Sequence, residues 1–184
     1  MSLHDIVFNY MSGWYSLMKE KELKYVKRTV EHISRVHRNA LSLLPFSNDV
    51  LLAGHEIEFM RNILNHDVSK LNDTQFCGYC NYDFSKKGKN SDKIENEFNQ
   101  AWVNHYSVEN HHPEGFINTL FDPKIAAEIA CDLCAMSQEF NSESAMIYLA
   151  DKWVDSNKPY FESDKDLQKY VAAISRCINV IEGN

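Results

Sequence analysis

Apolar residues recur every three or four positions along most of the chain, which is the spacing of an α-helix with one buried face. The longest such stretch covers residues 20–44, where the apolar face runs from Leu23 to Leu44. The same spacing predicts further helices over 48–65, 92–108, 122–140, 143–155 and 164–182. No segment alternates regularly enough to predict a strand. The pattern therefore predicts an all-α protein, a single-domain bundle of about six or seven helices, with a core over about 20–140 and C-terminal helices 141–184 packed on it.

Local start and stop signals support the boundaries of two of these helices. Asp122 followed by Pro123 is typical of an N-cap and a first helical position. Ser163 with Asp166 resembles a capping box, and Gly183 marks the end of the last helix. These signals predict helices that begin after Asp122 and after Ser163.

Composition and charge narrow the class of protein. The 184 residues contain 44% hydrophobic and 24% charged residues, as expected for one soluble globular domain over residues 1–184. The formal net charge of −7 argues against duplex nucleic acid as a partner, because such proteins usually present a basic face. No apolar run reaches the ~18 to 20 residues of a membrane span, and no signal peptide is evident. We therefore expect a cytoplasmic protein with no membrane association.

The five cysteines leave more than one interpretation open. The segment 72–92 is rich in Gly, Asn, Asp and Lys and predicts a loop, in which Cys77 and Cys80 form a C-x-x-C pair. Cys131 and Cys134 form a second pair inside a predicted helix. A four-cysteine zinc site and a redox pair are possible readings, but buried reduced thiols are favoured in a chain without a secretion signal.

Histidine and aspartate residues interrupt the apolar faces of the predicted helices. His66 lies three residues after Ile63 with Asp67 beside it, and Asp132 lies between Ile129 and Met136. The ligand-type side chains expected to face the interior are His32, His66, Asp67, His105, His111, His112 and Asp132. Burying a carboxylate without a partner costs several kcal/mol. Imidazole and carboxylate together suit divalent transition metals, so the pattern predicts one or two ions of Fe, Mn, Zn, Ni or Co.

The order of these residues resembles the H…HD…D signature of the HD-domain superfamily of metal-dependent phosphohydrolases, over about residues 25–140. The strings HDVSK and NHHPEG are similar to motifs of the dinuclear HD-GYP phosphodiesterases. The glycines and tyrosine that follow the double histidine in that branch are absent, so specificity for cyclic dinucleotides does not carry over. The whole string HD-x-S-K, AW-x-x-H, N-HH-P-E and C-D-x-x-AMS is most similar to an uncharacterised HD-like family of bacterial and viral proteins.

The resemblance implies a metal site with defined roles. One ion would be held by His32, His66, Asp67 and Asp132, and Asp67 would bridge to a second ion held by His105 and by His111 or His112. Lys70 would offer a positive charge to a phosphate oxygen, so Asp67 and Lys70 are the expected catalytic residues. Glu109 and Glu114 are interpreted as a solvated loop rather than as acceptors for the histidines.

The implied activity is hydrolysis of a nucleotide-like or other small phosphate ester, by a phosphatase or a phosphodiesterase, through a metal-activated water. Two alternatives stay open. Some HD-fold proteins hold a di-iron centre and cleave bonds with dioxygen, and the same ligand types suit that chemistry. The fold can also serve as a metal-holding binding or regulatory module without turnover.

Overall fold

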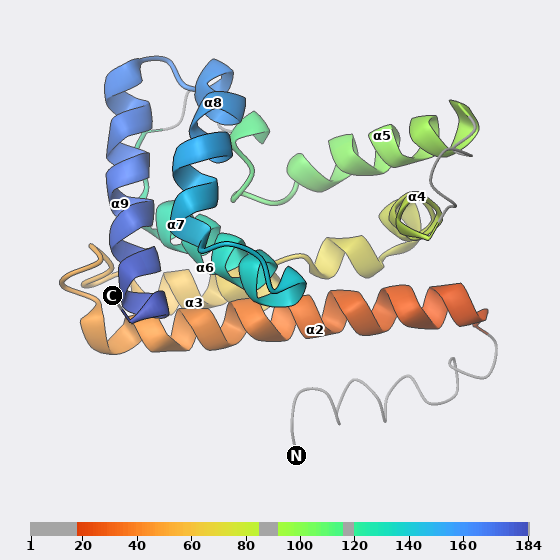
Figure 1. Cartoon of the computed structure of the whole chain (residues 1–184), viewed down its shortest axis with the longest axis horizontal. Helices are drawn as coiled ribbons and strands as arrows, with labels where there is room; N and C mark the ends of the chain where they lie inside the picture. Colours follow the sequence, from red (N-terminus) through yellow and green to blue (C-terminus); the bar gives the residue numbers. More distant parts are fainter. Residues whose placement is uncertain (1–17, 85–91, 116–119, 184) are drawn as a thin grey trace. The chain divides into compact units, whose positions relative to one another are not determined.

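The structure is a computed structural model that describes residues 18–84, 92–115 and 120–183. Within these ranges the chain is helical and contains no strand, which confirms the predicted all-α class (Figure 1). The α-helices are α2 (Glu20–Leu43), α3 (Glu56–Asn65), α4 (Asp73–Asp83), α5 (Asp92–Tyr106), α6 (Pro123–Phe140), α7 (Ala145–Tyr148), α8 (Val154–Asn157) and α9 (Asp164–Glu182). None of the helices in the described ranges combines the length and apolar character needed to cross a membrane.

The contacts of the backbone divide the chain into two compact units. Unit 1 contains Met1–Ser34 and Asp67–His105, and unit 2 contains Arg35–His66 and Tyr106–Asn184. Helix α2 is continuous across the boundary between Ser34 and Arg35. The expectation of a single domain stays a prediction, and each unit is described below by itself.

In unit 2, helix α6 packs against α9, α3 and α7. Its buried face consists mainly of small side chains, namely Ala126, Ala127, Ala130, Cys131, Cys134 and Ala135. Small side chains allow neighbouring helices to approach closely on several sides, which explains why this face is the one buried. The predicted apolar face is confirmed in part: Ile129 is buried, but Met136 is 39% exposed. Asp132, expected at a core position, is half-buried.

Helix α3 begins eight residues later than predicted. The expected helix began at residue 48, but Leu51 and Gly54 have positive φ angles of 65° and 80°, which an α-helix does not accept. The carbonyl of Ser47 instead accepts hydrogen bonds from the amides of Leu52 and Ala53. Leu52 is buried, although it lies in this turn rather than in a helix.

In unit 1, most of the predicted loop over 72–92 is helix α4, so this prediction was wrong; residues 85–91 lie outside the described ranges. Gly78 lies in the middle of α4. Glycine in the sequence suggested a loop, but at this position it allows α4 and α5 to pack closely. A Cβ atom there would lie 2.6 Å from the carbonyl oxygen of Glu97 and 2.6 Å from Cβ of Ala101, both on α5. Tertiary packing against α5 therefore stabilises a helix that lacks a clear apolar face.

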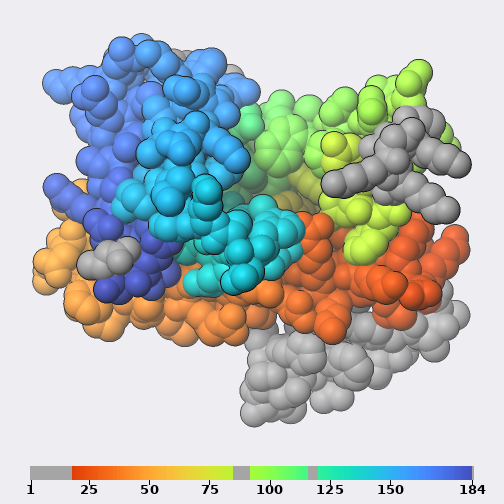
Figure 2. All heavy atoms as spheres, in the orientation of Figure 1, coloured from red at the N-terminus to blue at the C-terminus, as the bar shows by residue number. Residues whose placement is uncertain are grey.

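The boundaries of the remaining helices agree with those predicted from the sequence, apart from two differences. Helix α5 ends at Tyr106, two residues before the predicted end, and Val108 is 62% exposed. The helix predicted over 143–155 is α7 and α8 joined by a π-helical turn, Leu149–Trp153, and this segment lies at the surface of unit 2 (Figure 2, light blue).

The predicted helix caps are confirmed. Oδ1 of Asp122 accepts a hydrogen bond from the Lys124 amide at 2.9 Å, at the start of α6. Oγ of Ser163 accepts one from the Asp166 amide at 3.2 Å, at the start of α9. Gly183 ends α9 with a φ of 75°.

The start of α7 is capped by the far end of α9, and this contact gives a test of the unit 2 packing. Oε1 of Glu182 accepts from the Ala145 amide at 2.8 Å, and Oε2 accepts from the Ser144 hydroxyl at 2.6 Å. We predict that Glu182→Ala lowers the free energy of unfolding by about 1 kcal/mol, the usual cost of losing a helix cap. Urea denaturation followed by circular dichroism measures this change. Glu162→Ala, at an exposed position, is the control and should change stability by less than about 0.5 kcal/mol.

Candidate metal centre

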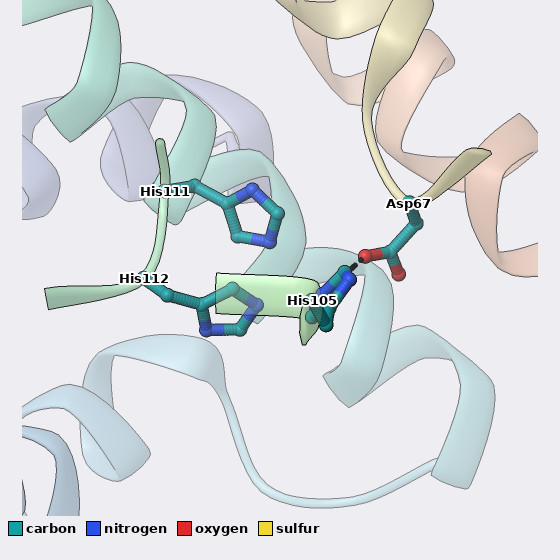
Figure 3. Close-up of side chains that lie close together, drawn as sticks. All are labelled: Asp67, His105, His111 and His112. Carbon is teal, nitrogen blue, oxygen red and sulfur yellow. Dashed lines mark ion pairs between the residues drawn. The ribbon is translucent and has the colours of Figure 1, made fainter. Parts of the chain in front are cut away.

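Asp67 is the centre of a cluster in unit 1, which we call the Asp67 cluster (His32, Asp67, Lys70 and His105). The aspartate is 1% exposed. Its Oδ2 lies 2.7 Å from Nζ of Lys70 and 3.5 Å from Nε2 of His32. Its Oδ1 lies 3.2 Å from Nε2 of His105, the pair joined by the dashed line in Figure 3. The structure therefore brings together three of the predicted metal ligands and the predicted catalytic lysine.

The backbone at the end of α3 explains how Asp67 reaches this position. His66 is the C-cap residue of α3, and Asp67 follows with a left-handed φ of 59°. Aspartate tolerates this conformation better than most residues, and such angles are often found at functional sites. A 3-10 turn, Val68–Leu71, then places Lys70 one turn after the aspartate. His66 and Asp67, adjacent in sequence, consequently belong to two different clusters.

Ser69 holds the imidazole of His105 from the other side. Its hydroxyl lies 3.0 Å from Nδ1 of His105, while Nε2 of the same ring faces Asp67. His105 is fully buried in the last turn of α5, so both ring nitrogens are placed by protein groups. The sequence did not single out Ser69, although its position two residues after Asp67 makes it a natural partner for a ligand near the aspartate.

A second cluster lies in unit 2, and we call it the Glu128 cluster (His66, His111, Glu128 and Asp132). Oε1 of Glu128 is 3.0 Å from Nδ1 of His66 and 3.2 Å from Nδ1 of His111. The other nitrogen of His66, Nε2, is 3.9 Å from Oδ1 of Asp132. The two imidazole rings lie against each other with centroids 4.2 Å apart. His66, His111 and Glu128 are buried and form a group that can hold a metal ion.

The sequence analysis did not identify Glu128. It lies four residues before Asp132 on α6, so both carboxylates are on the same side of that helix. The Glu-x-x-x-Asp spacing is the signal that could have found it. Burial acts to raise the pKa of Glu128, but hydrogen bonds and charge interactions with His111 and His66 outweigh burial and lower the pKa to about 2. Glu128 is therefore ionised at neutral pH.

The double histidine lies in the segment between α5 and α6. The rings of His111 and His112 are 4.2 Å apart, and the sticks in Figure 3 show them following one another on this segment. His112 is half-buried. The expectation of a solvated loop was wrong for Glu109, which is 7% exposed with Oε2 4.0 Å from Nδ1 of His111. Glu114 is half-buried rather than solvated.

One pair of side chains in each cluster lies at a separation that is compatible with two ligands of one divalent ion. Two ligand atoms that each lie about 2.0 to 2.2 Å from one ion are at most about 4.4 Å apart. The separations between His32 and Asp67 (3.5 Å) and between His66 and Asp132 (3.9 Å) are within that limit. Both exceed the ordinary length of an N–H···O hydrogen bond. Buried histidine and carboxylate groups that can hold a metal ion are therefore present, and the sharing of one ion by His32 and His66 stays a prediction.

Among the residues that the structure describes, no cysteine belongs to a group of side chains that could hold a metal ion. Cys77 and Cys80 lie on α4 in unit 1, and all five thiols are reduced. Cys131, Cys134 and Cys177 are buried in unit 2. Burial raises the pKa of Cys131 well above its ordinary value and raises the pKa of Cys134 and of Cys177 to about 12. Buried thiols of this kind pack as small apolar side chains.

Comparison with known proteins places the chain in one family. The chain belongs to a family of unknown function (DUF5662), which matches residues 21–176. The matched range includes both the Asp67 cluster and the Glu128 cluster. No curated protein and no solved structure matches the chain. The function is therefore inferred from the chemistry of the two clusters.

Proposed function

We propose that the protein is a metal-dependent phosphohydrolase, a phosphatase or phosphodiesterase that acts on a nucleotide-like or other small phosphate ester. The observation that carries the proposal is the burial of imidazoles and carboxylates at ligand spacing in two clusters, with the lysine cation of Lys70 in one of them. The proposal keeps the ligand set implied by the resemblance to HD-domain proteins.

The chemistry needed for ester hydrolysis matches these groups. A divalent ion supplies a Lewis acid and lowers the pKa of a bound water toward neutrality. The carboxylate of Asp67 supplies negative charge between His32 and His105, and Ser69 keeps the His105 ring in place. The reaction consumes one water, replaces a P–O–C linkage by P–OH and releases an alcohol, with no change of oxidation state.

The charge of Lys70 supports a phosphate substrate in particular. Its Nζ is bound to Oδ2 of Asp67 at 2.7 Å, and its side chain is 21% exposed, so the ammonium group is held beside the cluster. Lysine is a common phosphate-binding residue because it acts as a compact point charge. A positive charge beside the Asp67 cluster favours an anionic substrate. An oxygenase that acts on a neutral substrate would not require this positive charge.

Metal analysis combined with a turnover assay tests the proposed function. Purified protein is stripped with a chelator and reloaded separately with Mn²⁺, Co²⁺, Ni²⁺, Zn²⁺ and Fe²⁺. Hydrolysis of p-nitrophenyl phosphate and of bis(p-nitrophenyl) phosphate is then followed with and without dioxygen. We expect metal-dependent release of p-nitrophenol that is independent of dioxygen. Two irons with an EPR signal and dioxygen consumption would support the oxygenase, and bound metal without turnover of any phosphate ester would support the binding module.

Substitution of Lys70 separates substrate binding from metal binding. We predict that Lys70→Met retains metal within a few-fold of the parent affinity and raises KM for the phosphate ester about 10-fold, because one charge-assisted contact to phosphate is lost. Isothermal titration with Co²⁺ and steady-state kinetics measure the two quantities. Lys27→Met, at an exposed position on α2, is the control. A loss of metal in Lys70→Met would show that the lysine only supports Asp67.

A further inference from the structure

Glu128 contacts two imidazoles through a single oxygen. Oε1 forms a hydrogen bond with Nδ1 of His66 at 3.0 Å and an ion-pair contact with Nδ1 of His111 at 3.2 Å. The side chain of Glu128 is 3% exposed, and those of His66 and His111 are 0% and 2% exposed, so water contributes little to these contacts. One carboxylate thus serves two predicted metal ligands at once.

The arrangement restricts the position of the ring protons. Oε1 forms a hydrogen bond with Nδ1 of His66, and an ionised carboxylate can only accept, so Nδ1 of His66 then carries the proton. The 3.2 Å ion-pair contact with Nδ1 of His111 places the same oxygen beside the second ring. A neutral imidazole that is protonated on Nδ1 has its lone pair on Nε2. For His66, Nε2 is also the atom that faces the carboxylate of Asp132.

We infer that Glu128 is a positioning residue that fixes His66 and His111 together in the tautomer that binds metal through Nε2. The inference rests on the metal centre of the proposed function and goes beyond it by assigning a role to a residue outside the predicted ligand set. Carboxylates that accept the other N–H of a metal-bound histidine hold the ring and increase its basicity as a ligand. Here a single carboxylate does this for two rings.

At His66 the geometry favours a supporting role for Glu128 over a role as a direct ligand, although His66, His111 and Glu128 lie close enough together to hold an ion. A direct role would place the ion between Oε1 and the Nδ1 atoms, and it would leave Asp132 on the opposite side of the His66 ring. The 3.0 Å contact between Nδ1 of His66 and Oε1 of Glu128 is a hydrogen bond, whereas the 3.9 Å separation between Nε2 of His66 and Oδ1 of Asp132 is too long for one. The ion therefore belongs on the Nε2 side of His66.

Titration of three variants with Co²⁺ in the absence of substrate tests the inference. Glu128→Met removes the acceptor and nearly keeps the volume, Glu128→Gln keeps a neutral acceptor, and Glu143→Met at an exposed site is the control. We expect Kd to rise about 10- to 100-fold in Glu128→Met, the usual effect of losing such a partner, and by less in Glu128→Gln. The number of ions at saturation should stay equal to that of the parent.

Two results of this titration would overturn the inference. An affinity of Glu128→Met within two-fold of the parent would show that the carboxylate does not support the ligands. A loss of one ion per chain at saturation would show that Glu128 is itself a ligand. The titration measures metal binding and needs no substrate. It can therefore be interpreted even if the protein binds metal but does not hydrolyse phosphate esters.

A second measurement on the parent protein applies even if the variants fail to fold. Zn²⁺-loaded protein with ¹⁵N-labelled histidine reports the tautomer of each ring through its nitrogen chemical shifts and two-bond couplings. We expect His66 and His111 both to carry hydrogen on Nδ1 and metal on Nε2. Metal on Nδ1 of either ring would overturn the inference.

Discussion

Asp67→Asn is expected to lose bound metal and phosphate ester turnover together. Asparagine tolerates the left-handed φ of 59°, so the turn after α3 is kept and only the charge is removed. The carboxylate of Asp67 faces His32 and His105 in a buried site, where a negative charge is a strong attraction for a cation. We predict a fall in metal affinity of at least about 100-fold, above the range for residues that only support a ligand.

Metal content by mass spectrometry and turnover at saturating metal measure the two effects of Asp67→Asn. Asp73→Asn is the matched control, because Asp73 is an exposed aspartate six residues away in the first turn of α4. The control should keep both metal and activity. Retention of the parent metal affinity in Asp67→Asn would refute the assignment of Asp67 as a ligand. Loss of turnover with metal retained would instead limit Asp67 to catalysis.

The second large effect concerns the fold of unit 1. Alanine normally stabilises a helix interior relative to glycine by roughly 0.5 to 1 kcal/mol. At Gly78 the added Cβ would lie 2.6 Å from the backbone oxygen of Glu97, a contact that requires α4 and α5 to separate. Overpacking of this kind typically costs about 1 to 3 kcal/mol. We therefore predict that Gly78→Ala destabilises the protein, opposite to the expectation from helix propensity.

Chemical denaturation followed by circular dichroism measures the effect of Gly78→Ala on the free energy of unfolding. Cys77→Ala is the control, since Cys77 is the preceding residue of α4 and is exposed. It should change stability by less than about 0.5 kcal/mol. A Gly78→Ala variant as stable as the parent would show that α4 and α5 are not packed as closely as described.

Helices with local signals were the predictable part of the fold. Helix α2 has regular apolar spacing, and α6 and α9 have capping residues at their starts, so their positions follow from the sequence. Helix α4 could not be predicted this way, because its stability depends on the fit of Gly78 against another helix. The start of α3 was missed because the positive φ of Leu51 has no local sequence signal, leucine being a poor residue for that conformation.

In the candidate site, too, some features follow from local sequence signals and others depend on tertiary packing. The burial of most of these histidines and of Asp67 could be predicted, because polar ligand-type side chains on apolar helix faces are unusual. Their supporting residues, Ser69 and Glu128, were missed because a hydrogen-bond partner is selected by tertiary packing and not by helical spacing. Lys70 was predicted as a phosphate contact, and the structure adds its ion pair with Asp67. The hydrogen-bond partners of the predicted ligands could be identified only from the structure.

The central claim is that cations bind where these imidazoles and carboxylates meet, and anomalous diffraction tests it most directly. Crystals of the protein loaded with Zn²⁺ would be measured on both sides of the zinc absorption edge. The account predicts an anomalous peak about 2.0 to 2.2 Å from Nε2 of His66 and from a carboxylate oxygen of Asp132. Fully loaded crystals with no peak at either the Asp67 cluster or the Glu128 cluster would contradict it.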